Sequence, residues 1–133
     1  MEQIIKERMA GTQNKINLAV LCFCYNREDH LRQSLPKIVE FKNELPLFVF
    51  CDGPREEDKK QTQKVRDYLT KTLLHSKNCK LIFREKNLGL ADNIISGVNY
   101  VFSKGYDAVT VLEDDCVPHS NYFDYMQCAL RYY

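Results

Sequence analysis

The sequence has 133 residues, 44% of them hydrophobic and 28% charged, with 19 basic and 18 acidic side chains and a formal net charge of +1. This length allows one domain, and the composition is typical of a globular protein and excludes a disordered chain. The nearly balanced charge gives no electrostatic case for a nucleic-acid partner, and no apolar run approaches the roughly 20 residues of a transmembrane helix.

The six cysteines include no C-x-x-C pair, and most of them fall within or at the end of apolar stretches. Free cysteines in such positions behave as small hydrophobic residues, so reduced core thiols are expected instead of a disulfide framework or a zinc site. The chain also has no N-x-S/T sequon, and we expect a cytoplasmic location. Residues 1–15 do not resemble a secretory signal and are expected to form a flexible segment before a domain that spans residues 16–133.

Four short apolar runs, rich in Val, Ile, Phe and Leu, alternate with longer amphipathic segments. The runs cover Asn17 to Cys24, Pro46 to Cys51, Cys79 to Arg84 and Asp107 to Leu112. Nearly continuous apolar runs of this length are typical of strands that are buried on both faces of a parallel sheet. The sequence therefore predicts four such strands.

The segment after the first run has the periodicity of an amphipathic helix. Its apolar stripe consists of Leu31, Leu35, Ile38 and Val39. Asn26 is the expected N-cap. Pro36 lies within the segment, and we expect it to kink the helix or to delay its start.

Three further helices are expected. The Asp-Gly-Pro sequence at residues 52–54 is expected to open the second, and the third carries an apolar stripe from Leu90 to Phe102 and ends at Gly105. The fourth starts near Ser120. The resulting β-α-β-α-β-α-β-α order predicts an α/β fold with an open, mostly parallel, Rossmann-like sheet, helices on both faces and right-handed crossovers.

Every predicted strand is followed by polar or charged residues. These strand exits are Tyr25-Asn26-Arg27, Asp52-Gly53-Pro54, Arg84-Glu85-Lys86-Asn87 and Glu113-Asp114-Asp115. Ligands of open α/β sheets bind outside the carboxyl ends of the strands. A turn does not by itself require charged side chains at every strand exit, so these residues predict a binding site.

The acidic exit at residues 113–115 is the strongest single feature. Three adjacent carboxylates repel one another and favour a compensating cation. Mg²⁺ and Mn²⁺ prefer such hard oxygen ligands, typically one or two carboxylates together with substrate phosphates. The alternative is that these carboxylates cap the next helix or lie in water, and the spacing alone does not decide between the two.

The other exits also have two interpretations each. Asp52 fits a helix cap as well as a ligand contact, and Tyr25 fits stacking on a base or packing against the sheet. Arg27 and Arg84 are suited to phosphate as planar donors, or to pairing with nearby acidic residues. Neither a Walker A sequence nor G-x-G-x-x-G is present, so a glycine-rich phosphate loop is not expected.

The exits and the segments around them resemble a known family. The segments are VLCFCYNREDHLRQSL, FVFCDGPREE, FREKNLGLADNIISGVNYVF and VTVLEDDCVPHSNYFDYM. Together they resemble the nucleotide-diphospho-sugar transferases of GT-A fold, especially the large inverting family two and the N-acetylglucosaminyltransferase I group. The match covers Leu18 to about Tyr125. Glu113 replaces the first aspartate of a strict D-x-D motif, as in the Glu-Asp-Asp variant of the N-acetylglucosaminyltransferase I group.

The resemblance implies a role for each position that matches the family. Cys24, Tyr25 and Asn26 would line the base pocket, Asp52 would bond the uracil ring, Arg27 would approach the diphosphate and Arg84 the base or phosphate. Asn87 and Asp92 would reach the donor sugar, Glu113 and Asp114 would face ribose and sugar, and Asp115 would bind Mn²⁺ or Mg²⁺. In the family these residues hold a UDP-sugar donor for inverting transfer to a saccharide or other hydroxyl acceptor.

The resemblance also implies that the general base and the acceptor-binding half lie beyond Tyr133. The sequence is therefore expected to be the donor-binding part of a truncated GT-A domain, inactive on its own, whose fourth strand leaves an exposed edge that invites self-association. Two other interpretations stay open. One is a Mg²⁺-dependent phosphotransfer domain, although such folds usually place their critical aspartate after the first strand, and the other is a non-catalytic nucleotide-binding module.

Overall fold

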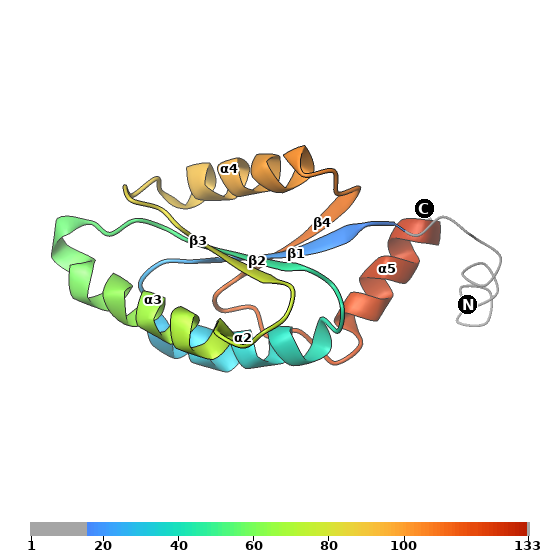
Figure 1. The fold of residues 1–133 in the computed structure, drawn as a ribbon, viewed down its shortest axis with the longest axis horizontal. Helices are drawn as coiled ribbons and strands as arrows, with labels where there is room; N and C mark the ends of the chain where they lie inside the picture. Colours follow the sequence, from blue (N-terminus) through green and yellow to red (C-terminus); the bar gives the residue numbers. More distant parts are fainter. Residues whose placement is uncertain (1–15, 133) are drawn as a thin grey trace.

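Four parallel strands form one sheet in the order β3-β2-β1-β4 (Figure 1). In the computed structural model, which describes residues 16–132, the strands are β1 (Leu18–Cys24), β2 (Leu47–Cys51), β3 (Cys79–Phe83) and β4 (Ala108–Glu113). Each lies within one residue of a predicted run at both ends, and the predicted parallel α/β fold is confirmed. The flexible segment predicted for residues 1–15 lies outside the described residues.

The two central strands are buried along their whole length, and the two edge strands are not. All residues of β1 and β2 are buried, whereas β3 has no buried residue and β4 alternates. The prediction of burial on both faces is therefore wrong for β3 and β4, because an edge strand has a neighbour on one side only. Val111 of β4 is 39% exposed. The predicted self-association through this edge stays a prediction.

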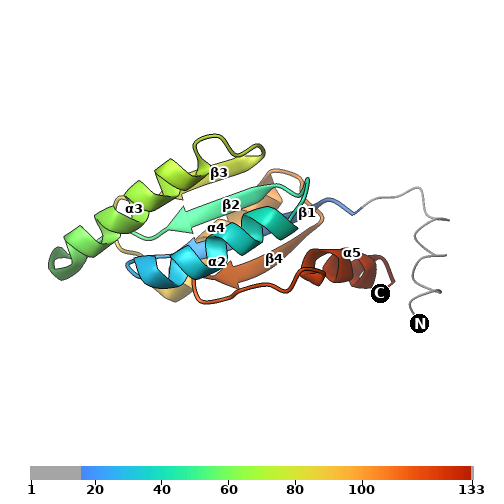
Figure 2. The same cartoon turned by 90° about the horizontal axis from the view of Figure 1, so that it is seen from below.

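Helices cover both faces of the sheet (Figures 1 and 2). On one face lie α2 (Glu28–Phe41) and α3 (Lys59–Leu73), and on the other lies α4 (Leu90–Ser103). The final helix, α5 (Tyr122–Tyr132), adds Phe123 to the core that α2 and α3 share with the sheet. Within the described residues, no helix is long and apolar enough to cross a membrane.

The core beneath α4 is aromatic and closely packed. Phe23 of β1 stacks on Phe50 of β2 with ring centroids 5.1 Å apart. A Cβ atom on Gly97 of α4 would lie 2.6 Å from the ring of Phe23, so a side chain at this position would push the helix from the sheet. Close contact between α4 and the central strands fixes the start of α4, which borders the site described below.

The start of α2 differs from the prediction at its N-cap, and of the two outcomes expected for Pro36 the delayed start does not occur. Arg27 is the N-cap and makes no side-chain capping bond, whereas Asn26 donates through Nδ2 to Asp58 at 3.4 Å. The helix begins at Glu28, so Pro36 lies inside it and does not delay its start. The turns before Pro36 form because Leu31 is fully buried, and the packing of an apolar face is the main source of helix stability in proteins.

The second helix starts later than residues 52–54. A short 3₁₀ helix covers Glu56–Asp58, and α3 begins at Lys59. The Asp-Gly-Pro sequence is therefore a loop, and Asp52 bonds to a different segment of the chain. The predicted end of the third helix is confirmed, since α4 stops at Ser103 and Gly105 adopts a φ of 94°, which glycine adopts without strain.

Candidate functional site

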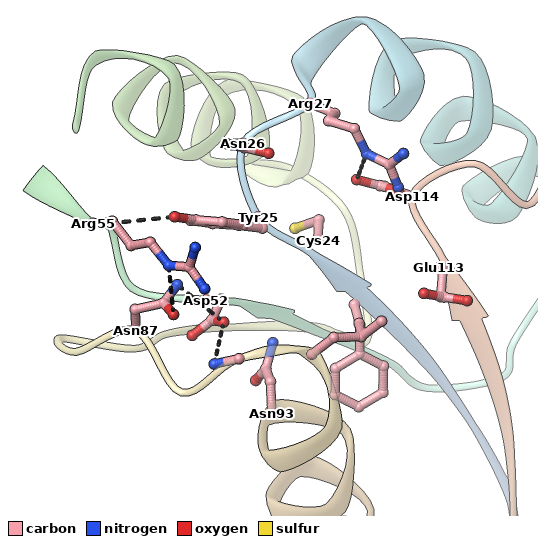
Figure 3. Close-up of a pocket in the computed structure, with 13 residues that line it drawn as sticks. Cys24, Tyr25, Asn26, Arg27, Asp52, Arg55, Asn87, Asn93, Glu113 and Asp114 are labelled. Carbon is pink, nitrogen blue, oxygen red and sulfur yellow. Dashed lines mark hydrogen bonds and ion pairs between the residues drawn. The ribbon is translucent and has the colours of Figure 1, made fainter. Parts of the chain in front are cut away.

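A pocket of about 310 Å³ lies at the carboxyl ends of β1, β2 and β4, next to the start of α4 (Figure 3). The chain passes from β1 to β2 and β3 on one side and places β4 on the other side of β1. Open α/β sheets bind their ligands where the strand order reverses in this way. The sequence predicted a site at the carboxyl ends of the strands, and the strand order of the structure places the pocket at the reversal between β1 and β4.

Eight of the predicted site residues line this pocket. They are Cys24, Tyr25, Asn26, Arg27, Asp52, Asn87, Glu113 and Asp114. The sequence interpretation did not include Arg55 and Asn93, which also line it. Arg55 lies in the exit of β2, three residues after Asp52, and Asn93 lies on the first turn of α4 one residue after Asp92. Arg55 directly follows the predicted exit at residues 52–54, whereas Asn93 is on a helix and no strand exit indicates it.

The other three predicted residues do not line the pocket. Arg84 donates from Nε to Oδ1 of Asn93 at 3.2 Å, and its guanidinium lies 5.2 Å from the ring centre of Phe50. Arg84 thus reaches the pocket only indirectly, through its hydrogen bond to the lining residue Asn93. Asp92 and Asp115 are both exposed, the first on α4 and the second one residue beyond Asp114.

Asp52 is buried and joins the end of β2 to the loop that precedes α4. Its exposed fraction is 3%. One carboxylate oxygen accepts hydrogen bonds from the backbone N–H groups of Gly53 and Leu88, each at 2.8 Å, and the other accepts from Gly89 at 3.0 Å. Asn87 adds a bond from Nδ2 to the carbonyl oxygen of Gly53 at 2.8 Å. Asp52 therefore fixes the loop that presents Asn87 to the pocket.

This junction leaves no room for a side chain at Gly53. A Cβ atom there would lie 2.3 Å from the backbone carbon of Lys86, a distance at which backbone must move. The glycine of the Asp-Gly-Pro sequence is thus required by the close approach of the loop before α4, and not by the start of a helix.

Tyr25 is held by a second acidic residue, Asp58. The Tyr25 hydroxyl donates a short hydrogen bond to Oδ2 of Asp58, while Oδ1 accepts from the backbone N–H of Arg55 at 2.8 Å. Arg55 in turn donates from Nε to Oδ1 of Asn87 at 3.3 Å. These linked hydrogen bonds hold the Tyr25 ring in place, and the ring forms one wall of the pocket.

Desolvation, and next the bond to Asp58, raise the pKa of Tyr25 to about 12. The folded state therefore holds this proton more tightly than the unfolded state, so the contribution to stability is present below the ordinary pKa of about 10 and is lost as the pH rises through about 12. We expect the difference between the tyrosinate absorbance titrations of the parent protein and Tyr25→Phe to show a midpoint near pH 12. Asp58→Asn should lower that midpoint, and an unchanged midpoint would contradict the role of Asp58.

Arg27 and Asp114 form the main ion pair of the pocket (Figure 3). Arg27 bonds through Nη2 to Oδ1 at 2.5 Å and through Nε to Oδ2 at 3.2 Å. The Asp114 side chain is 5% exposed and that of Arg27 is 47% exposed. The hydrogen bond to Asp114 raises the pKa of the Arg27 guanidinium. The cation that compensates the buried Asp114 is thus Arg27, which revises the argument that the acidic exit needs a metal for this purpose.

The remaining two carboxylates of the exit suit a metal that arrives with a phosphorylated ligand. Glu113 lines the pocket, and Asp115, two residues further along the chain, is exposed. Among residues 16–132, no three His, Cys, Asp or Glu side chains gather closely enough to hold a metal by themselves. Mg²⁺ commonly takes one or two carboxylates and completes its shell with substrate phosphates and water. The donor set fits that arrangement, and it does not fit a cage made of protein ligands alone.

The strand order and the polar pocket at the strand reversal define an α/β protein with a pocket where open sheets of this kind bind ligands. The chain matches the family described as Glycosyl transferase family 2 over residues 19–129. It belongs to that family, which confirms the resemblance to family two. No curated protein matches the sequence.

A solved structure has a similar fold. It is described as the mannosyltransferase PcManGT from Pyrobaculum calidifontis in complex with GDP-Man and Mn²⁺. The TM-score is 0.62 at 14% sequence identity, and the match covers 97% of this chain and 37% of that one. This similarity confirms the fold, and the present chain spans a little over a third of the length of the mannosyltransferase.

Proposed function

We propose that this chain binds the nucleotide-sugar donor in an inverting glycosyl transfer, with UDP as the nucleotide and a divalent metal at the diphosphate. The observation that carries the proposal is the single pocket at the strand reversal, which unites the exits of β1, β2 and β4 with the loop before α4. Membership of glycosyl transferase family 2 supports the reaction class. The acceptor would be a saccharide or another hydroxyl compound.

The proposed placement puts the base between Tyr25 and the Asp52 junction, beside Cys24 and Asn26. Tyr25 offers an aromatic wall that Asp58 holds in place, and both oxygens of Asp52 accept hydrogen bonds from the loop before α4. Asp52 would therefore shape the base pocket by fixing the loop, in addition to the bond to uracil that the family resemblance implies.

Arg27 would bind the diphosphate. Its guanidinium is half-exposed at the mouth of the pocket, and a planar donor pair suits phosphate oxygens as well as a carboxylate. The buried partner Asp114 keeps it oriented before the ligand arrives. Asn87, and Asp92 with Asn93 of α4, would lie on the sugar side, with Arg84 acting through Asn93.

Glu113 and Asp115 would hold Mn²⁺ or Mg²⁺ together with the diphosphate. Such a metal stabilises, as a Lewis acid, the negative charge that develops on the departing nucleoside diphosphate. Arg27 adds positive charge at the same place. The proposed setting is the cytoplasm, a compartment in which thiols are kept reduced in the absence of an oxidant.

Calorimetric titration of the chain with UDP, GDP, ADP and inorganic phosphate, each with Mn²⁺ and with EDTA, tests the proposal. We expect UDP to bind in Mn²⁺, more tightly than ADP, and to lose affinity in EDTA. Tighter binding of GDP than of UDP would contradict uracil as the base, but it would still support a nucleotide-sugar donor site. Equal affinity for UDP and ADP, or no effect of EDTA, would overturn the donor-site proposal, and equal binding of phosphate would favour phosphotransfer.

A further inference from the structure

Two cysteines lie opposite each other at the carboxyl ends of the central strands, and one of them lines the pocket. Cys24 of β1 and Cys51 of β2 are register partners, and both side chains belong to the core on the α2 and α3 face. They therefore point to the same side of the sheet. The paired strands of residues 16–132 place no other two cysteines opposite each other.

Each sulfur lies near the backbone of the opposite strand. The Cys24 Sγ is 3.8 Å from the carbonyl oxygen of Phe50, and the Cys51 Sγ is 3.8 Å from that of Tyr25. Neighbouring strands are about 4.8 Å apart, and the Cα atoms of disulfides are usually about 4.4–6.8 Å apart. The two thiols are thus close enough to join with a small movement of the strands.

We propose that Cys24 and Cys51 form a reversible disulfide with a hydroperoxide as the oxidant, and that this bond weakens nucleotide binding. Cys24 lines the pocket and Cys51 is fully buried, so a small oxidant that enters the pocket reaches the pair at Cys24. The Cys24 thiol and, next, the Arg66 guanidinium stabilise the Cys51 thiolate and lower the pKa of Cys51, while the same thiol pair raises the pKa of Cys24. The two thiols therefore act as one coupled pair, in which one sulfur reacts with the oxidant and the other completes the disulfide.

The reaction converts two thiols and one hydrogen peroxide into one disulfide and two waters. One thiol of the pair, as the thiolate, attacks a peroxide oxygen, the O–O bond breaks, and the hydroxide that leaves takes up a proton as water. The sulfur of the other cysteine then attacks the sulfenic sulfur. The S–S bond forms, the S–O bond breaks, and the hydroxyl leaves with the proton of the second thiol as the second water.

The effect on the pocket follows from the neighbours of the two cysteines. Tyr25 and Asp52 each follow one of them directly in sequence. A disulfide brings its Cβ atoms to about 3.8 Å, so closing the bond displaces the ends of both strands and the groups that hold the pocket. A displacement on the order of 1 Å can cost up to about 10²-fold in function, and we expect UDP affinity to fall about tenfold. This second part rests on the proposed function.

The test uses the full chain, treated with hydrogen peroxide and digested with trypsin without reduction. The expected product links residues 16–27, which contain Cys24, to residues 43–55, which contain Cys51, and dithiothreitol should separate them. Fragmentation of the linked peptides assigns the sulfur, because Cys22 shares the first peptide. A link through Cys22, Cys79, Cys116 or Cys128 instead, or oxidation to sulfinic acid with no link, would overturn the proposal.

Two variants complete the test. Cys51→Ala should remove the link and make UDP affinity insensitive to peroxide, whereas the control Cys79→Ala, whose register partner is Leu47, should behave as the parent protein. If Cys51→Ala does not fold, the peptides of the parent protein still decide whether the bond forms. Linked peptides in a chain that never binds UDP would contradict the proposed function and support the disulfide, while equal UDP binding before and after linkage would overturn its effect on the pocket.

Discussion

Replacement of Asp52 by alanine should lower the free energy of unfolding by about 3 kcal/mol. The carboxylate is buried and accepts hydrogen bonds from three backbone N–H groups. Each hydrogen bond to a charged group contributes about 1.5–3 kcal/mol, and a buried donor left without a partner has a cost of its own. Water that enters the space left by the side chain should recover part of the loss. Urea unfolding followed by circular dichroism measures the change.

A matched control and a conservative variant sharpen this experiment. Asp92→Ala removes an exposed carboxylate from the first turn of α4, and it should cost well under 1 kcal/mol. Asp52→Asn keeps one carbonyl oxygen and should fall between the parent protein and Asp52→Ala. If Asp52→Ala unfolds at the same urea concentration as the parent, the carboxylate does not hold the loop, and a contact with ligand becomes its main role.

Asp115→Asn should reduce Mn²⁺-dependent UDP affinity by about 10–100-fold and leave the fold intact. Asp115 is exposed, and it forms no ion pair within the described residues. Loss of one anionic ligand weakens a site for a hard cation, and even residues that only support metal ligands change affinity by about this factor. Calorimetry with UDP and Mn²⁺ gives the affinity, and thermal melts without metal report on the fold.

Asp124→Asn is the control for the loss of one negative charge, because Asp124 is exposed on α5. It should change neither affinity nor melting temperature to a measurable degree. A melting temperature of Asp115→Asn far below that of the parent would show that Asp115 stabilises the fold as a local cap instead of binding metal. Equal affinity of Asp115→Asn and the parent would exclude it as a metal ligand.

The strands, their parallel order and the location of the site could be predicted from the sequence, because each depends on local signals. Short apolar runs such as residues 18–24 indicate buried strands, and their alternation with helices indicates parallel strands joined by right-handed crossovers. The rule that ligands bind at the carboxyl ends then selects the exits. For this reason most of the predicted residues, Arg27 and Glu113 among them, do line one pocket.

The hydrogen-bond partners could not be predicted, because they join segments that are far apart in sequence. Asp52 bonds to the backbone of Gly89, and no local pattern distinguishes this role from a helix cap. Asn26 looked like a cap and bonds to Asp58 instead. Arg84 follows a strand as expected, yet it lies against Phe50 because β3 is an edge strand.

The most direct test of the donor site is to locate the bound nucleotide by NMR. With UDP and Mg²⁺, the amide shifts of the chain should change at the ends of β1, β2 and β4 and in the loop at residues 86–89. Paramagnetic Mn²⁺ added with UDP should broaden the amides of residues 113–116 first. Changes that instead centre on the surface between α2 and α3, which Arg32, Lys64 and Tyr68 line, would contradict a donor site at the strand reversal.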